Sequence, residues 1–284
     1  MVIVTDLELY VHRDWNDTID NVLIPRANKG WDNLLIFDGM ERIGKTKFAV
    51  TTGYVYAWKL GKKFSLDNVH FDPEEMMKFA TTTRNQVIIW DEAATAGLAK
   101  NWQSETQQQI LKILMMAGKY GHLWIFIVPS FFELSRYIAL HRSLFLIHLY
   151  TPDLITRGYF RVFNQLEKAY IYTNLKKKMT YGKQDSFVGD YGIKNTEKIL
   201  DWDAYEAKKD KAIMKVVENE LPKKERKLLL LQYKVAMGFP NKVAAEALGI
   251  PYKTIQEWRN HGVRLGITAD DEQRNNTLSR EEEF

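Results

Sequence analysis

The chain has no cysteine among its 284 residues, so it contains neither a disulfide framework nor a thiolate metal site. This absence fits a reducing compartment. No apolar run approaches the roughly 18 residues that a membrane span needs, and residues 1–6 (MVIVTD) lack the basic start and apolar stretch of a secretory signal. We therefore expect a cytoplasmic protein without a membrane span, in the host cytoplasm if a virus or mobile element encodes it.

The chain also lacks a large excess of one charge, because its 40 Lys and Arg nearly balance its 36 Asp and Glu, for a net charge of +4. The distribution along the chain is nevertheless uneven. Residues 222–264 hold nine basic and three acidic residues, a local charge of +6, whereas residues 269–284 hold two basic and six acidic residues, a charge of −4. A basic segment before an acidic tail predicts polyanion binding, with the tail either competing for that site or serving as a disordered solubilising end.

The most informative motif that is present is a phosphate loop. Residues 39–46 (GMERIGKT) match the pattern G-x-x-x-x-G-K-[ST] at every position, between an apolar run that predicts a strand and a segment that predicts a helix. Such a loop points backbone N–H groups at phosphates, and the helix N-terminus adds its positive dipole. We expect ATP to be bound by Gly39, Met40, Glu41, Arg42, Ile43, Gly44, Lys45 and Thr46.

Two acidic residues follow a second apolar strand, Ile88-Ile89-Trp90. Asp91 and Glu92 at its end match a Walker B motif. The first acid would hold Mg²⁺ through water, beside the Thr46 hydroxyl that ligates it, and the second would be the general base for the attacking water. Lys45 and Glu92 are therefore candidate catalytic residues. The alternative is an ordinary strand that ends in a solvated acidic turn.

Strands and helices alternate along residues 31–173, which predicts a three-layer α/β fold with a mostly parallel sheet. Because ligands bind beyond the carboxyl ends of parallel strands, both motifs fall at the same edge. We expect a helix from 73 with Asp72 as its cap, and a C-cap at Gly121. The predicted strands are 33–38, 69–71, 86–92, 123–128, 144–150 and a hairpin of 159–163 with 169–172, and two further helices are predicted at 105–120 and 132–141.

Composition divides the chain into five parts. They are a leading segment (1–30), the ATPase domain (31–195, with a polar loop over 174–195), a connecting helix (196–221), a small all-α helix-turn-helix domain (222–268) and an acidic tail (269–284).

Residues 241–259 have the form of a helix-turn-helix, with Ala245 small at the helix crossing and Gly249 at the turn. The second helix would expose four side chains that suit a DNA groove: Tyr252, Lys253, Gln256 and Arg259. The alternative is a small helical bundle that contacts other proteins.

Together, residues 39–46, 88–92 and 118–130 (GKYGHLWIFIVPS) resemble the additional-strand P-loop ATPases of the FtsK–HerA group. That group includes DNA translocases, packaging and transfer motors, and zonular-occludens-toxin-like phage assembly proteins. The resemblance implies a homo-oligomeric ring, a hexamer or pentamer, with ATP between subunits, DNA in the centre and phage or plasmid partner proteins. It places Ser130 where relatives have a polar residue at the γ-phosphate.

Phosphoryl transfer usually needs a further cation, often an arginine from a neighbouring subunit. Arg136 and Arg142 follow the strand that ends near Ser130. Arg142 lies just before the next strand and is the candidate catalytic arginine, with a plain surface charge as the alternative for both.

The sequence thus predicts an ATP- and Mg²⁺-dependent hydrolase that moves DNA in packaging, transfer or segregation. Two alternatives stay open. One is an AAA+-like helicase loader or transposition regulator, and the other is a DNA-binding regulator controlled by ATP. DNA-stimulated turnover favours a motor, whereas tight binding of one sequence with slow turnover favours a regulator.

Overall fold

The computed structural model describes residues 2–91, 111–112, 114–182, 184–192, 195–220 and 253. The chain divides into two compact units, Met1–Lys209 and Asp210–Phe284. The first unit carries almost all of the described residues. The predicted helix-turn-helix lies outside the described residues, apart from Lys253.

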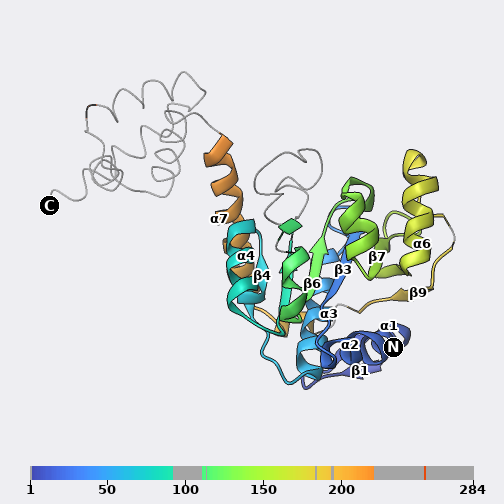
Figure 1. Cartoon of the computed structure of the whole chain (residues 1–284), viewed down its shortest axis with the longest axis horizontal. Helices are drawn as coiled ribbons and strands as arrows, with labels where there is room; N and C mark the ends of the chain where they lie inside the picture. The colour runs from blue at the N-terminus through green and yellow to red at the C-terminus, as the bar shows by residue number, and fades with distance from the viewer. Residues whose placement is uncertain are drawn as a thin grey trace. The chain divides into compact units, whose positions relative to one another are not determined.

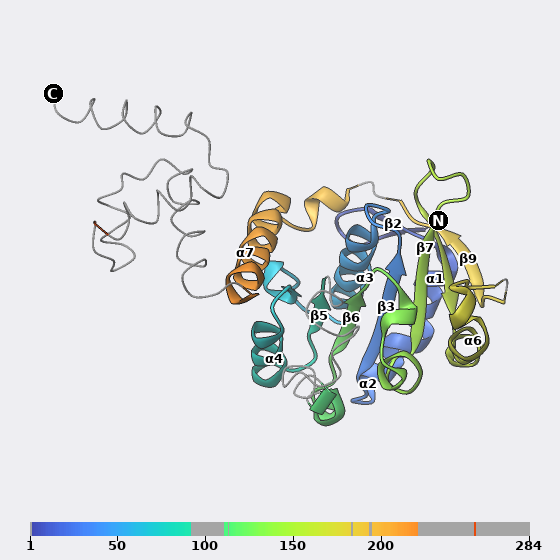
Figure 2. The ribbon, with the colours of Figure 1, turned by 90° about the horizontal axis from the view of Figure 1, so that it is seen from above.

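A seven-stranded sheet forms the centre of the described part of the first unit, in the order β4-β5-β6-β3-β7-β8-β9. The first five strands in this order, β4, β5, β6, β3 and β7, run parallel, while β8 is antiparallel to both of its neighbours. Figure 2 shows β5, β6, β3 and β7 side by side. The bounds are β4 Val69–His70, β5 Val87–Trp90, β6 Leu123–Ile127, β3 Asn33–Gly39, β7 Phe145–Tyr150, β8 Tyr159–Phe163 and β9 Phe187–Asp190. The predicted, mostly parallel α/β sheet is confirmed.

The central strand β3 is buried along its whole length, as expected of a parallel strand covered on both faces. Its side chains alternate between two apolar clusters. Leu35 and Phe37 belong to one cluster, whereas Leu34 and Ile36 belong to the other. Two apolar layers on opposite faces of one sheet make a three-layer α/β arrangement.

Helix α3 (Lys45–Lys59) and the N-terminal segment cover the first face (Figure 1). Trp15, Ile19 and Leu23 recur every four residues and are fully buried, as the inward stripe of a helix requires. The Trp15 indole also donates a hydrogen bond to the Thr52 hydroxyl of α3, at 3.0 Å. This segment comprises β1 (Val2–Val4), β2 (Leu9–Val11), α1 (Arg13–Thr18), a π-helical turn (Ile19–Leu23) and α2 (Ile24–Asn28).

The second face is covered by α4 (Pro73–Thr82) and by short helical turns. The predicted cap of α4 is confirmed, because the Asp72 carboxylate accepts from the N–H groups of Glu74 and Glu75 at 2.8 and 3.1 Å. Gly121 is left-handed (φ 69°) and ends a 3₁₀ turn over Ala117–Tyr120, so its predicted capping role is confirmed as well.

The strand predicted at 169–172 is wrong. Helix α6 (Gln165–Tyr170) and a π-helical turn (Ile171–Leu175) occupy this stretch. Asn164 starts the helix through a capping box, since its side chain accepts from the Glu167 N–H while the Glu167 carboxylate accepts from the Asn164 N–H. The strand that pairs with β8 is instead β9, which lies within the segment predicted as a loop.

The helix predicted at 132–141 is also interrupted. A 3₁₀ turn (Phe131–Glu133) and a π-helical turn (Tyr137–Arg142) replace it. Leu134 between them is extended, at φ −69° and ψ 151°. Elsewhere, a 3₁₀ turn over Thr196–Lys198 precedes α7 (Trp202–Glu220). Among the described residues, none of the helices has the length and apolar character for crossing a membrane.

Lys168 of α6 is fully buried. Its ammonium donates to the carbonyls of Ala139 and Ser143 at 3.2 and 2.6 Å and to the Ser143 hydroxyl at 2.5 Å. Burial lowers the pKa of Lys168 to about 7, because leaving water disfavours the charged form.

This pKa makes stability depend on pH. Between about pH 7 and the ordinary lysine pKa of 10.5, the unfolded chain holds the proton that the folded chain has lost, so the free energy of unfolding rises with pH. Relative to Lys168→Met, which lacks the titrating group, we expect the wild type to gain about 2 kcal/mol between pH 7 and 9. Urea titrations at these two pH values measure the difference. Parallel pH curves for the two proteins would contradict the burial argument.

Candidate nucleotide-binding site

The phosphate loop lies where the sequence predicts it, between the carboxyl end of β3 and the N-terminus of α3. Arg42 and Gly44 are left-handed, at φ 58° and 106°. Alternation between left- and right-handed residues turns successive N–H groups toward one point, which is how a backbone binds anions. A Cβ on Gly44 would stand 2.5 Å from the Tyr191 hydroxyl oxygen, so this turn has room only for glycine.

Lys45 begins α3 and folds back over the loop. Its ammonium donates to the carbonyls of Gly39 and Met40, at 2.6 and 2.8 Å. These contacts keep the cation at the phosphate loop. The position is the one from which a lysine contacts the outer phosphates of a nucleotide.

Thr46 and Asp91 come from different elements and meet in the site. The Thr46 hydroxyl donates to Asp91 Oδ2 at 2.8 Å. Asp91 is 2% exposed, and its backbone N–H donates to the His70 carbonyl of the adjacent strand at 2.9 Å. The predicted pair of Mg²⁺ ligands is therefore assembled by the fold.

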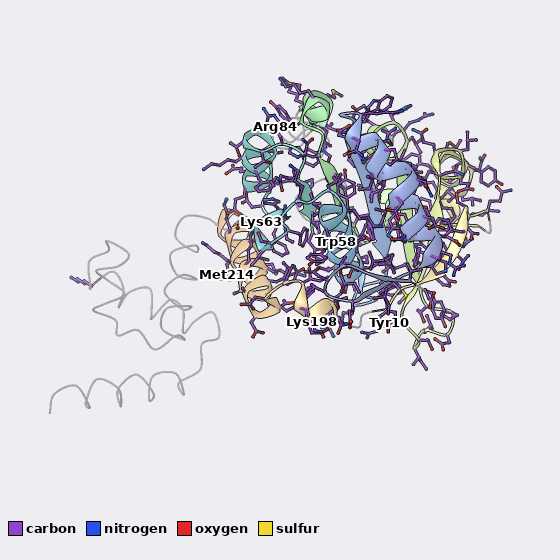
Figure 3. The ribbon with its side chains drawn as sticks, turned by 90° about the horizontal axis from the view of Figure 1, so that it is seen from below. Tyr10, Trp58, Lys63, Arg84, Lys198 and Met214 are labelled. Atoms are coloured by element: carbon purple, nitrogen blue, oxygen red, sulfur yellow. The ribbon has the colours of Figure 1, made fainter. Side chains whose placement is uncertain are left out.

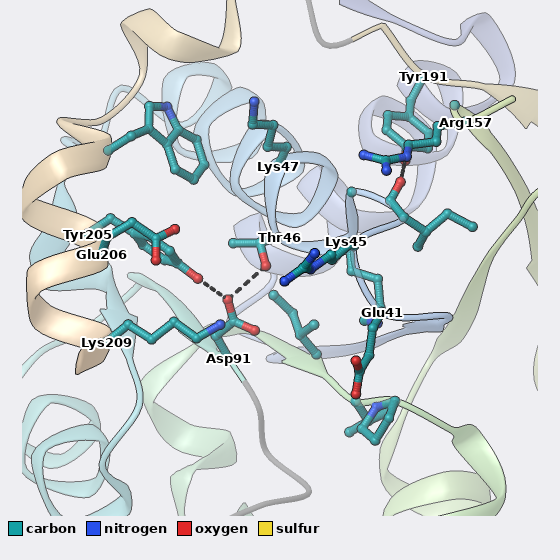
Figure 4. Close-up of a pocket in the computed structure, with 18 residues that line it drawn as sticks. Glu41, Lys45, Thr46, Lys47, Asp91, Arg157, Tyr191, Tyr205, Glu206 and Lys209 are labelled. Atoms are coloured by element: carbon teal, nitrogen blue, oxygen red, sulfur yellow. Dashed lines mark hydrogen bonds between the residues drawn. The ribbon is translucent and has the colours of Figure 1, made fainter. Parts of the chain in front are cut away.

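A third group, which the sequence analysis missed, contacts the same carboxylate. The Tyr205 hydroxyl of α7 donates to Asp91 Oδ2 at 2.5 Å, and Figure 4 shows Thr46 and Tyr205 converging on this oxygen. Burial, and next the negative charge of Asp91, raise the pKa of Tyr205 well above its ordinary value. The hydroxyl is therefore a neutral donor at physiological pH.

A cavity of about 720 Å³ opens beside these residues. Side chains of α7 line it at positions 202, 205, 206 and 209, which is the spacing of one helix face. Five cations and three acids share the lining, which favours a polyanionic ligand. The cations are Arg42, Lys45, Lys47, Arg157 and Lys209, and the acids are Glu41, Asp91 and Glu206.

Tyr191 also lines the cavity and supports the loop. Its ring stacks on Phe48 of α3, with centroids 4.7 Å apart, and its hydroxyl donates to the Ile43 carbonyl at 2.5 Å. Burial raises the pKa of Tyr191 to about 12. The hydroxyl therefore remains protonated, and it fixes the turn from a residue 148 positions away in the chain.

These residues fit a nucleotide and a divalent cation. The phosphate loop and Lys45 line the cavity together, so backbone N–H groups and a positive charge are available to a phosphate group there. The Thr46 hydroxyl and the Asp91 carboxylate are hard oxygen donors of the kind that Mg²⁺ prefers. Bound Mg²⁺ would neutralise charge on the phosphates and position them for transfer.

The other predicted site residues have different outcomes. Val128 and Pro129 line the cavity, while the Ser130 hydroxyl accepts from the Phe132 N–H at 3.3 Å and caps a 3₁₀ turn. Glu92, Tyr252, Gln256 and Arg259 lie outside the described residues, and their roles stay predictions.

Within one chain, Arg142 is not brought to the phosphate loop. Its guanidinium pairs with Asp32, and its Nε donates to the Leu114 carbonyl at 3.1 Å. Asp32 precedes β3 and Arg142 precedes β7, so the pair lies at the amino ends of parallel strands, opposite the loop. Two other guanidinium groups of the described residues line the cavity, those of Arg42 in the loop and of Arg157 in the connection between β7 and β8.

Comparison with known proteins gives distant likenesses. No protein-family model matches the chain, and no curated protein is significantly similar to it. Among solved structures, the N-terminal domain of zonular occludens toxin from Neisseria meningitidis is 13% identical at a TM-score of 0.40, and the match covers 59% of this chain and 98% of that domain.

Two further structures show a similar degree of likeness. The genome-packaging NTPase B204 of Sulfolobus turreted icosahedral virus 2, solved with AMPPCP, is 13% identical at a TM-score of 0.34, covering 48% of this chain and 94% of that one. A RuvB mutant from Thermotoga maritima is 14% identical at 0.36, covering 91% and 89%.

Proposed function

We propose that this chain is an ATP- and Mg²⁺-dependent hydrolase that couples nucleotide turnover to movement of DNA. One observation carries the proposal: the phosphate loop, Lys45 and the Thr46–Asp91 pair at 2.8 Å line a single cavity with an excess of cations. A triphosphate with a divalent metal matches that donor set and charge.

Each residue has a defined part in the proposal. The turn over 42–46 and Lys45 hold the phosphates, while Thr46 and Asp91 hold Mg²⁺. Glu92, next along the chain, is the general base. Arg157 supplies a positive charge within the chain, and Arg142 is proposed to act in a neighbouring subunit's site only if its pair with Asp32 opens.

DNA is the proposed polymer because residues 222–264 carry a net charge of +6 and a helix-turn-helix pattern. Positive charge supplies affinity for phosphates, and Tyr252, Lys253, Gln256 and Arg259 are the side chains proposed to contact the duplex. The proposal includes a homo-oligomeric ring, in which DNA would pass through the centre while the subunits hydrolyse ATP.

Arg259→Ala tests the DNA part. Loss of a groove contact is expected to raise the DNA concentration that half-saturates ATPase stimulation by about tenfold. Fluorescence anisotropy with labelled duplex measures the DNA affinity, and an ATPase titration with DNA measures the half-saturating concentration. Lys29→Ala removes an equal charge from an exposed site in the first unit and serves as the control. Equal DNA affinity of the Arg259 variant and the wild type would contradict the proposal that the predicted helix-turn-helix domain binds DNA.

A further inference from the structure

Helix α7 lies against the metal side of the proposed nucleotide site. Asp201 caps the helix by accepting from the N–H groups of Asp203 and Ala204, at 3.1 and 3.0 Å. About two turns later, the Lys208 ammonium donates to the Leu66 and Val69 carbonyls, at 3.2 and 2.6 Å. The helix is thereby fixed beside β4, at the same edge of the sheet as Asp91.

Tyr205 is held firmly in this position. It is 3% exposed, and its ring packs edge-on against Phe71 and beside Trp202, with both centroid distances 5.3 Å. This packing fixes the ring, and so limits which acceptors its hydroxyl can reach. The hydrogen bond to Asp91 Oδ2 is a consequence of how α7 packs.

Asp91 Oδ2 accepts two hydrogen bonds, from Thr46 and from Tyr205. A carboxylate oxygen has two acceptor sites. The Thr46 bond is compatible with a metal, because the hydroxyl oxygen can ligate Mg²⁺ through a lone pair while its O–H still donates to Asp91 Oδ2. The Tyr205 proton, however, occupies the other acceptor site of Oδ2, so a water of a bound Mg²⁺ shell could donate to this oxygen only by displacing it.

A charge from the same helix strengthens this competition. In Figure 4 the side chain of Lys209 extends from α7 toward Asp91, and Lys209 lines the cavity. A cation near the carboxylate disfavours a second, divalent cation at the same place. Hydroxyl and ammonium thus act in the same direction, from one face of one helix.

We propose that Tyr205 is a positioning residue of the metal site, which holds Asp91 while Mg²⁺ is absent and gives up that hydrogen bond when Mg²⁺ binds with nucleotide. The inference rests on the proposed function, since it concerns the same pocket. Its consequence is specific: α7 sets how much Mg²⁺ the site needs. Removing the hydroxyl should make metal binding easier, whereas the loss of a merely structural contact would make it harder.

Tyr205→Phe is the test, because the ring and its packing are retained. Binding of a fluorescent ATP analogue is titrated in excess EDTA and then at increasing Mg²⁺. We expect the affinity in EDTA to stay within about twofold of wild type, while the half-saturating Mg²⁺ concentration falls about tenfold. Tyr54→Phe is the matched control, since it removes another tyrosine–aspartate hydrogen bond, to Asp6 at 3.0 Å, from a residue that does not line the cavity.

The outcomes separate the two proposals. If the wild type binds no analogue with or without Mg²⁺, the proposed function fails and this inference fails with it. If the wild type binds but Tyr205→Phe needs as much or more Mg²⁺, only the role of Tyr205 is overturned. Should that variant not fold, Lys209→Met gives the deciding result in the same titration, with a lower Mg²⁺ requirement expected and an unchanged or higher one overturning the proposal.

Discussion

Lys45→Ala is expected to lose at least about 100-fold of ATP turnover. The ammonium is held over the phosphate loop by the carbonyls of Gly39 and Met40, so its charge is already in place when a nucleotide enters. Without the ammonium, no fixed positive charge at this position stabilises the negative charge that develops on the outer phosphates in the transition state. Phosphate release under saturating ATP and Mg²⁺ measures the effect, and circular dichroism shows whether the variant is folded.

A charge-matched control separates this role from a general electrostatic effect. Lys63 is exposed in the loop after α3 (Figure 3) and is not among the residues that line the cavity. Lys63→Ala should turn over ATP at the wild-type rate. If the Lys45 variant is folded and hydrolyses ATP as fast as the Lys63 variant, the assignment of Lys45 is wrong.

Gly39→Ala is expected to destabilise the first unit by about 3 kcal/mol or more, which lowers its melting temperature by roughly 10 °C. Gly39 ends β3 at φ 135°, a conformation that side chains rarely adopt. An added Cβ would also collide with the backbone carbonyl of Leu149 on β7, its register partner. Backbone within a parallel sheet cannot move aside without breaking ladder hydrogen bonds.

Gly61→Ala isolates the conformational part of this cost. Gly61 has φ 63°, but nothing lies within 4 Å of the position that an added methyl group would take, so only the left-handed penalty of about 1 kcal/mol remains. Thermal melting of the two variants beside the wild type gives the comparison. Equal shifts for both variants would show that the close approach of Leu149 does not matter.

The phosphate loop and the Asp91 strand were predictable because their signals are local. Gly39, Gly44, Lys45 and Thr46 stand within eight consecutive residues, and the apolar runs on either side predict the strand and the helix that hold them. The meeting of Thr46 with Asp91 also followed, since parallel strands present their carboxyl ends at one edge.

The remainder of the cavity depends on contacts between distant parts of the chain. Tyr205 is 114 residues from Asp91, and Tyr191 is 148 residues from Ile43. The one local signal was the spacing of positions 202, 205, 206 and 209 on one helix face, which gives no indication of what that face contacts.

The wrong strand at 169–172 has a local explanation. Its residues, AYIY, are apolar and aromatic, and so suit a strand. The helix start at Asn164 with Glu167 three residues later was a readable capping signal that outweighs this preference. Lys168 then fastens the helix to the adjacent turn through three hydrogen bonds.

Calorimetric titration of the full chain with ATP and Mg²⁺ tests the central claim most directly. A pocket built from the phosphate loop, Lys45, Thr46 and Asp91 predicts saturable uptake of one nucleotide per chain, weaker when EDTA removes the metal. Folded protein that takes up no nucleotide under either condition would contradict the account.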